Sequence, residues 1–353
     1  MSDLRPVDIQ PPIESTATIK ESLPNIPVAE DLARYRVELE TKIITGNLPP
    51  KEWRELSAAM LDKYPTIGKY HWKIDSLVDG FVHARYYLDH LWEENNLPES
   101  QMEADPTTAA SMCQSLFDYQ SEEEVKIQKG TIGLVAMFSD NDYQKLLQKM
   151  QHPESDIVVG FQTNLNNLQV IVAKASVLWP SMDNRHYLHE NEHIKDTILE
   201  ETIDSFILPY KGRDEISDGF RRLHKNRFRR LQSEINAYFS AVPLLTKKSF
   251  IGDYHDWLIK LLTEDGAYYR TSCQPQGITA DEYTNVATTG IDSIFELYHL
   301  YEDAYPDINP AKMSAYTLGQ FPVDKWPVVV RLIKQRRGNT TKRRSMSAGK
   351  LEE

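Results

Sequence analysis

The spacing of apolar residues changes along this 353-residue chain, and this change limits the fold more than any other feature of the sequence. Apolar residues recur at helical spacing through 53–92, and helical spacing returns at about 187–208 and 228–242. Between these regions, short runs rich in β-branched residues occur at 130–138 and 168–177. We therefore predict an α+β fold that is predominantly helical and contains one small β-sheet.

The small sheet is expected to contain three strands and one helix. The strands are predicted at 130–138, 156–162 and 168–177. Ser139 or Asp140 can cap a helix that follows the first strand, because short polar side chains accept hydrogen bonds from the first helical N–H groups.

Composition divides the chain into four predicted parts. Prolines and polar residues in 1–27 predict a disordered N-terminal arm. A helical N-terminal region is expected over 28–125, including a short helix that starts at Asp105. A domain with the sheet and further helices should cover 126–334, followed by a basic disordered tail over 335–353.

Charge is distributed unevenly along the chain. Seven basic residues and no acid lie between residues 331 and 344, so the net charge of −12 divides into +7 there and −19 over the rest. An acidic body argues against a nucleic-acid binder, since phosphate contacts need a basic surface, and only the tail is expected to bind such a partner. A second basic stretch, 221–230, is interpreted as a solvated start of a helix, with a face for nucleic acid or an acidic partner as the alternative.

The sequence predicts a cytoplasmic protein that does not enter the membrane. No run of about 18 apolar residues is present, and Met1 to Gln10 lack the basic and apolar parts of a secretory signal. The two cysteines, Cys113 and Cys273, are far apart, which argues against a disulfide scaffold and against a zinc site made of thiolates.

One motif carries chemistry. His189, Glu190 and His193 form a His-Glu-x-x-His pattern, and residues four apart on a helix lie one turn apart on the same face, so both imidazoles can bind one Zn²⁺ ion. Glu190 can then act as the general base that takes a proton from a zinc-activated water. Glycine-rich nucleotide loops and the Gly-x-Ser-x-Gly motif are absent from the sequence, which argues against nucleotide chemistry and serine hydrolysis.

The motif contains an unusual charge. Glu192 lies between the histidines, although the equivalent helix of zinc peptidases is usually buried. A helical wheel places the histidines between two apolar flanks and places Asn191 and Lys195 on the opposite side. We therefore expect a solvated back of this helix, where Glu192 lies beside Lys195.

The third metal ligand has to come from another helix. Glu234 falls inside the apolar stripe of the predicted helix 228–242, where a carboxylate is costly unless a cation meets it. Glu234 is therefore the favoured ligand, and Glu200, Glu201 and Glu215 remain alternatives. Glu200 is the weakest of these, because it lies about 10.5 Å along the helix axis from the second histidine.

These features together resemble the gluzincin group of zinc metallopeptidases. The resemblance covers about residues 130–245 and rests on a strand, the His-Glu-x-x-His helix and a later helix that carries Glu-x-x-Ala, here Glu234 to Ala237. It implies a zincin-like core in which the two histidines and Glu234 bind zinc and Glu190 is the general base.

The resemblance also implies further site residues. The strand before the motif would pair with an extended substrate, and its candidates are Gln169, Val170, Ile171 and Val172. Tyr238 stands where many members keep an acid that orients a histidine, so no orienting residue is predicted. Tyr238 and His224 are candidates for stabilising the transition state, with a half-buried aromatic and a solvated histidine as the alternatives.

The predicted function is that of a zinc metallopeptidase that hydrolyses peptide bonds in a peptide or protein substrate. The alternative is a noncatalytic interaction or scaffold protein. In that case the motif would be structural or accidental, and the basic tail would bind an acidic partner or nucleic acid.

Overall fold

The computed structural model describes the chain in segments: residues 26–68, 118–129, 134–150, 160–165, 168–178, 185–202, 226–245, 248–264, 266 and 268–348. The predictions for the N-terminal arm before residue 26, for the apolar pattern 74–92 and for the helix from Asp105 to 117 lie outside these residues. No helix in the described segments combines the length and the apolar character that crossing a bilayer requires.

Helices make up most of the described chain. The longer helices are α2 (Ile26–Gly46), α3 (Pro50–Met60), α7 (Asp140–Lys149), α9 (Arg185–Thr202), α11 (Arg229–Phe239), α12 (Lys248–Thr263), α13 (Ala280–Ala304), α14 (Pro310–Leu318) and α15 (Trp326–Ala348). The short ones are η1 (Leu61–Lys63), α4 (Pro65–Gly68), α8 (Ala175–Leu178), η3 (Val242–Leu244), η4 (Tyr269–Cys273), η5 (Gln274–Gln276) and η6 (Val323–Lys325). The strands are β1 (Lys126–Lys129), β2 (Leu134–Phe138), β3 (Gly160–Leu165) and β4 (Leu168–Lys174). The predicted α+β class with a predominance of helix is confirmed.

The sheet has four strands in the order β1-β2-β4-β3, one more than the sequence predicts. β2 and β4 are parallel, and the two outer strands run antiparallel to their neighbours. The pattern missed β1 because its sequence, KIQK, has a single apolar residue, Ile127, which is buried against the sheet. The predicted third strand is too long, since the chain turns into α8 at Ala175.

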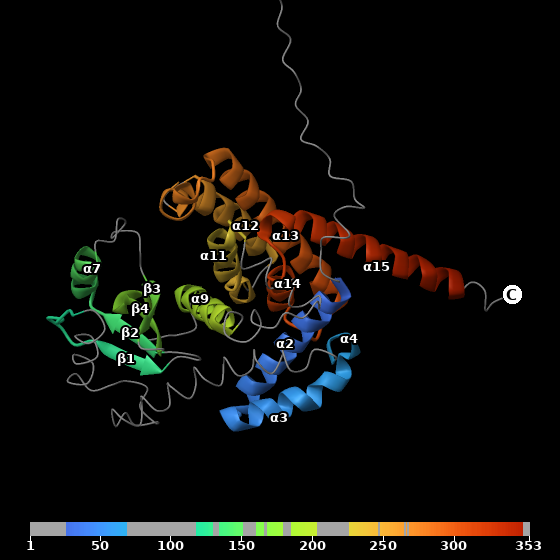
Figure 1. Cartoon of the computed structure of the whole chain (residues 1–353), viewed down its shortest axis with the longest axis horizontal. Coiled ribbons are helices and arrows are strands. Elements are labelled where there is room, and N and C mark those ends of the chain that lie inside the picture. The colour runs from blue at the N-terminus through green and yellow to red at the C-terminus, as the bar shows by residue number, and fades with distance from the viewer. Residues whose placement is uncertain are drawn as a thin grey trace, which may run out of the picture.

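The sheet is covered by a helix on each face (Figure 1). Alternate residues of β2 and β4 pack toward α7 on one side and toward α9 on the other. The α7 helix begins where the sequence predicts, because the Ser139 side chain accepts a hydrogen bond from the backbone N–H of Asp142. Cover on both faces leaves every residue of β2 buried.

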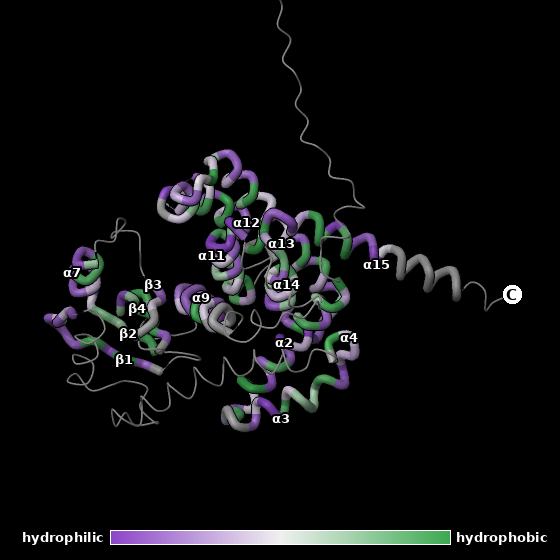
Figure 2. Tube along the Cα trace, viewed as in Figure 1, coloured by the Kyte–Doolittle hydropathy of each residue, from purple (hydrophilic) through white to green (hydrophobic). Residues whose placement is uncertain are grey.

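The remaining helices form a second body with its own core. Ala29, Ala33 and Val37 of α2 lie in the same apolar core as buried residues of α11 to α15. Another side of α2 packs against α3 and α4, through residues such as Leu32 and Tyr35. Figure 2 shows hydrophobic and hydrophilic stretches alternating along α2. The α2 helix thus connects the helices of the predicted N-terminal region to the C-terminal helices.

The last helix is longer than the sequence predicts. α15 continues to Ala348 and so includes much of the segment 335–353 that was predicted to be a disordered tail. At the start of that segment, Arg336 pairs with the Glu30 carboxylate of α2 at 2.7 Å, and this contact holds the helix against the body. The rest of α15 extends away from the other helices (Figure 1).

Candidate metal centre

The α9 helix lies between the sheet and α11 (Figure 1). Its residues Tyr187 and Ile194 pack on the sheet face formed by β2 and β4. The opposite side contacts α11, whose buried residues Leu231 and Ile235 belong to the core of the helical body. Side chains that point from α9 toward α11 are therefore enclosed by two rigid elements.

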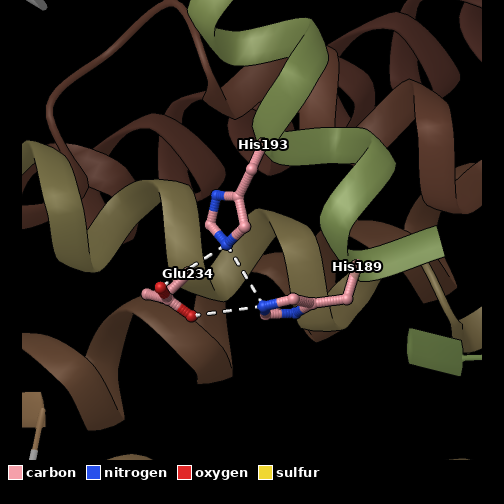
Figure 3. Close-up of side chains that lie close together, drawn as sticks. All are labelled: His189, His193 and Glu234. Atoms are coloured by element: carbon pink, nitrogen blue, oxygen red, sulfur yellow. Dashed lines mark hydrogen bonds and ion pairs between the residues drawn. The ribbon is translucent and has the colours of Figure 1, made fainter. Parts of the chain in front are cut away.

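Three candidate ligands meet between these helices. His189 and His193 project from α9, and Glu234 projects from α11 with its carboxylate facing both rings (Figure 3). The Nε2 atoms of the two histidines lie 3.1 Å apart. The Glu234 oxygens lie 3.6 Å from His189 Nε2 and 3.5 Å from His193 Nε2. The structure thus brings together the three residues that the sequence proposed as ligands.

These separations match the geometry of a tetrahedral zinc site. Two ligand atoms each about 2.0–2.2 Å from one zinc ion at a tetrahedral angle lie about 3.3–3.6 Å from each other. The three observed separations range from 3.1 to 3.6 Å. The donors therefore need little movement to share one ion, and imidazole with carboxylate is a donor set that suits zinc.

The three side chains are also largely withdrawn from water, with exposed fractions of 13% for His189, 18% for His193 and 20% for Glu234. Burial lowers the pKa of His189 to about 3, which keeps this ring neutral and able to donate a lone pair. Burial would also lower the pKa of His193, but the adjacent Glu234 carboxylate raises it to about 9. Burial opposes ionisation of Glu234 as well, yet the two histidines lower its pKa below the usual range.

Glu190 is placed beside the ligands and against the sheet. One of its carboxylate oxygens lies 3.9 Å from His189 Nε2, and the side chain is buried. The Glu190 side chain lies beside β3, next to Gly160. Burial raises the pKa of Glu190 to about 7, and the negative charge of the nearby Glu234 adds to this increase.

The carboxylates of this centre are neutralised in part by one imidazole, because His193, with its raised pKa, is protonated at neutral pH. Within the described segments, the ion pairs of Glu190 and Glu234 are made with the two histidines, and no lysine or arginine pairs with either acid. Two buried carboxylates without a lysine or arginine are costly, and a bound divalent cation removes this cost.

The other side of α9 is buried too, which corrects the predicted solvated back. Asn191 and Lys195 have exposed fractions of only 5% and 7%. Glu192 does pair with Lys195, as expected, but inside the protein. The helical wheel predicted an exposed side because it considers only the polarity of the residues on α9 itself. It contains no information about α2 and α14, which bring charged partners to this side of α9.

These partners form a group that we call the Glu40 cluster, made of Arg36, Glu40, Glu192, Lys195, Lys312 and Tyr316. The Glu40 carboxylate lies 3.4 Å from Arg36 Nε and 3.3 Å from Lys312 Nζ. It also accepts a hydrogen bond of 2.6 Å from Tyr316. Burial alone would raise the pKa of Glu40, but the nearby positive charges, that of Lys195 first, lower it to about 2.

The remaining predicted site residues are placed as follows. Tyr238 packs its ring 4.2 Å from the His189 ring, and burial raises its pKa, so its hydroxyl stays protonated. His224 and Glu215 lie outside the described residues, and the side chains of Glu200 and Glu201 are not described. Among the described side chains, Glu234 is the acid that reaches both histidines.

The predicted substrate strand is wrong in its position. Gln169, Val170, Ile171 and Val172 belong to β4, which pairs with β2 on one side and with β3 on the other. A strand paired on both sides has no backbone edge for a substrate. The edge strand of the described sheet on this side is β3, and the sequence could not reveal this because it does not encode the order of strands.

The sequence also missed a contact behind His193. The Nδ1 atom of His193 lies 3.1 Å from the Ser233 hydroxyl, which donates a hydrogen bond of 2.7 Å to the Asp196 carboxylate. Ser233 directly precedes Glu234, and Asp196 lies one turn after His193, so both are close to the motif in sequence. Nothing in either spacing distinguishes them from ordinary polar helix residues.

Comparison with known proteins adds no relative: no family model, curated protein or solved structure matches this chain.

Proposed function

We propose that this chain is a zinc-dependent metallopeptidase that hydrolyses peptide bonds in a peptide or protein substrate. The observation that carries the proposal is the convergence of His189, His193 and Glu234 on one point at zinc-ligand spacing, beside the second buried carboxylate of Glu190. Three protein ligands leave one position of a tetrahedral ion open, which is typical of catalytic zinc sites and not of structural ones.

The proposal includes a gluzincin-like, zincin-type arrangement of the core. It rests on the element order β3, β4, α9 and α11, with the motif on α9 and the third ligand on α11. The charged Glu192 argued against such a core in the sequence. Its burial beside Lys195 removes that objection, because the pair is neutral as a whole.

A bound zinc ion would polarise a peptide carbonyl and lower the pKa of a water molecule. Glu190, whose carboxylate lies beside the candidate ligands, is placed to take a proton and to give it to the leaving nitrogen. The protonated hydroxyl of Tyr238 is the candidate donor to negative charge that develops on the carbonyl oxygen.

The β3 strand suits the binding of an extended peptide. Within the described sheet, β3 pairs with β4 on one side only, so its other side offers backbone groups to an added strand. Glu190 lies beside this strand, with its side chain next to Gly160. A substrate strand added along β3 would therefore run past Glu190, which is the location that the chemistry requires.

Metal analysis and peptide cleavage test the proposal. Purified protein should contain about one zinc ion per chain, His189→Ala should lose it, and Glu190→Gln should keep it. Cleavage of a peptide library should fall by about 10²–10⁴-fold in Glu190→Gln, the usual contribution of a general base.

The outcomes separate the alternatives. If the wild-type protein binds no zinc, the proposed metallopeptidase function is wrong. Zinc that is retained while Glu190→Gln leaves every cleavage activity unchanged would make the site structural, as in a noncatalytic interaction protein.

A further inference from the structure

A hydrogen-bonded chain runs from the metal-facing imidazole of His193 into the space between α9 and α11. Ser233 Oγ lies 3.1 Å from His193 Nδ1 and 2.7 Å from Asp196 Oδ2. All three side chains are partly buried, and two helices supply them: His193 and Asp196 come from α9, Ser233 from α11. The contact therefore forms only when the helices are docked.

The number of available hydrogens determines which atom donates in each of these hydrogen bonds. A serine hydroxyl has one hydrogen, and Ser233 donates it to the Asp196 carboxylate. Its oxygen can then only accept from the His193 ring, so Nδ1 must carry a proton. A neutral ring protonated at Nδ1 has its lone pair on Nε2, the atom that faces His189 and Glu234.

The other histidine has no comparable support in the described segments. The Nδ1 atom of His189 is buried and has no hydrogen-bond partner there. The Tyr238 ring packs against His189 instead, where it restricts the ring by contact without choosing a tautomer. The two candidate ligands are thus held by different means.

We propose that Ser233 and Asp196 are positioning residues for zinc: Asp196 orients the Ser233 hydroxyl, and Ser233 fixes the His193 ring with Nε2 toward the ion. This inference rests on the proposed function, since it assigns residues to the same site. Partners of this kind typically contribute 10–100-fold to metal affinity, because they orient the ring and increase its basicity.

Zinc affinity, measured by competition with a chromophoric chelator, tests the assignment. Ser233→Ala should bind zinc about 10–100-fold more weakly than wild type. Ser233→Thr keeps a hydroxyl and should restore the affinity. Ser240→Ala is the matched control, because Ser240 caps the end of the same helix and bonds the Ala237 carbonyl, away from His193. Its zinc affinity should equal that of wild type.

A second readout separates positioning from a general loss of stability. In zinc-loaded wild type labelled with ¹⁵N-histidine, the His193 Nδ1–H proton should give a signal that exchanges slowly with water. Ser233→Ala should lose this slow exchange, and Ser240→Ala should keep it. Slow exchange that persists in Ser233→Ala would overturn the assignment, whatever the unfolding temperature of the variant.

The role of Asp196 is tested by a double-mutant cycle. Asp196→Asn should weaken zinc binding in the wild-type background and have no further effect in Ser233→Ala, because it acts through the serine. Equal effects in both backgrounds would overturn this part. Wild type that binds zinc no more tightly than Ser233→Ala contradicts only the positioning role, whereas wild type that binds no zinc contradicts the proposed function itself.

Discussion

The α9 helix carries buried charges on two sides, and the two sides are neutralised differently. Toward α2 and α14, the acids of the Glu40 cluster meet Arg36, Lys195 and Lys312 at contact distance. Toward α11, the acids Glu190 and Glu234 meet only imidazoles among the described residues. The Glu40 cluster is thus neutralised by lysine and arginine, whereas the candidate site relies on the protonated His193 ring, which a bound metal ion would replace as the positive charge.

The first prediction concerns a variant that lacks the negative charge of Glu234. Glu234→Gln should lose more than about 100-fold in zinc affinity, since a direct ligand contributes more than an orienting partner does. Without metal, Glu234→Gln should lose less unfolding free energy relative to wild type than Glu40→Gln does. The reason is that Glu234→Gln also removes the repulsion between Glu190 and Glu234. Chelator competition and urea unfolding measure the two effects. Full zinc binding by Glu234→Gln would place the third ligand elsewhere, with Glu200, Glu201 and Glu215 next.

The second prediction removes the matching acid from the other side. Glu40→Gln leaves the partly buried Arg36 and Lys312 without their carboxylate, so it should cost unfolding free energy, less than the roughly 3–5 kcal/mol of breaking a fully buried pair. Its zinc content should stay at the wild-type level, because Glu40 does not contact the ligands. Loss of zinc together with stability would show that the two sides of α9 are not independent.

The third prediction concerns the pH dependence of stabilisation by zinc. In the metal-free protein the pKa of Glu190 is raised to about 7 and that of His193 to about 9. Both groups bind protons in the fold that they release when unfolded, so metal-free stability should fall as the pH rises from about 4.5 to 7 through Glu190 and from about 6.5 to 9 through His193. Zinc no longer competes with these protons at higher pH. Its effect on the unfolding temperature should therefore be larger at pH 8.5 than at pH 6.5, and the reverse order would contradict the assigned protonation.

The smallest predicted effect is the loss of unfolding free energy at acidic pH. The pKa of Glu40 is lowered from 4.5 to about 2 by its cations, so its contribution to stability is complete above pH 4.5 and is lost as the pH falls toward 2. Urea unfolding of wild type between pH 5 and 3 should show a steeper loss of stability than unfolding of Glu40→Gln. Equal slopes would mean that the Glu40 cluster does not hold this carboxylate ionised.

The sequence predicted the convergence of His189, His193 and Glu234 better than it predicted the surroundings of these residues. The spacing of His189 and His193 places them on one helical face in any protein, and a carboxylate at position 234 within an apolar stripe required a partner. Both inferences use the geometry of a single helix. The location of the substrate edge, the buried state of Lys195 and the contact of Ser233 with His193 depend on neighbouring elements, and each was missed or misplaced.

By itself, the sequence determined which side chains each helix and strand presents and at what spacing, because these follow from local backbone geometry and from the period of apolar residues. The tertiary structure alone decided that β4 lies inside the sheet, that α2 and α14 bring one cation each to the back of α9, and that α11 docks so that Glu234 faces both histidines. Helix docking and strand order arise from contacts between residues far apart in the chain, and no local pattern encodes such contacts.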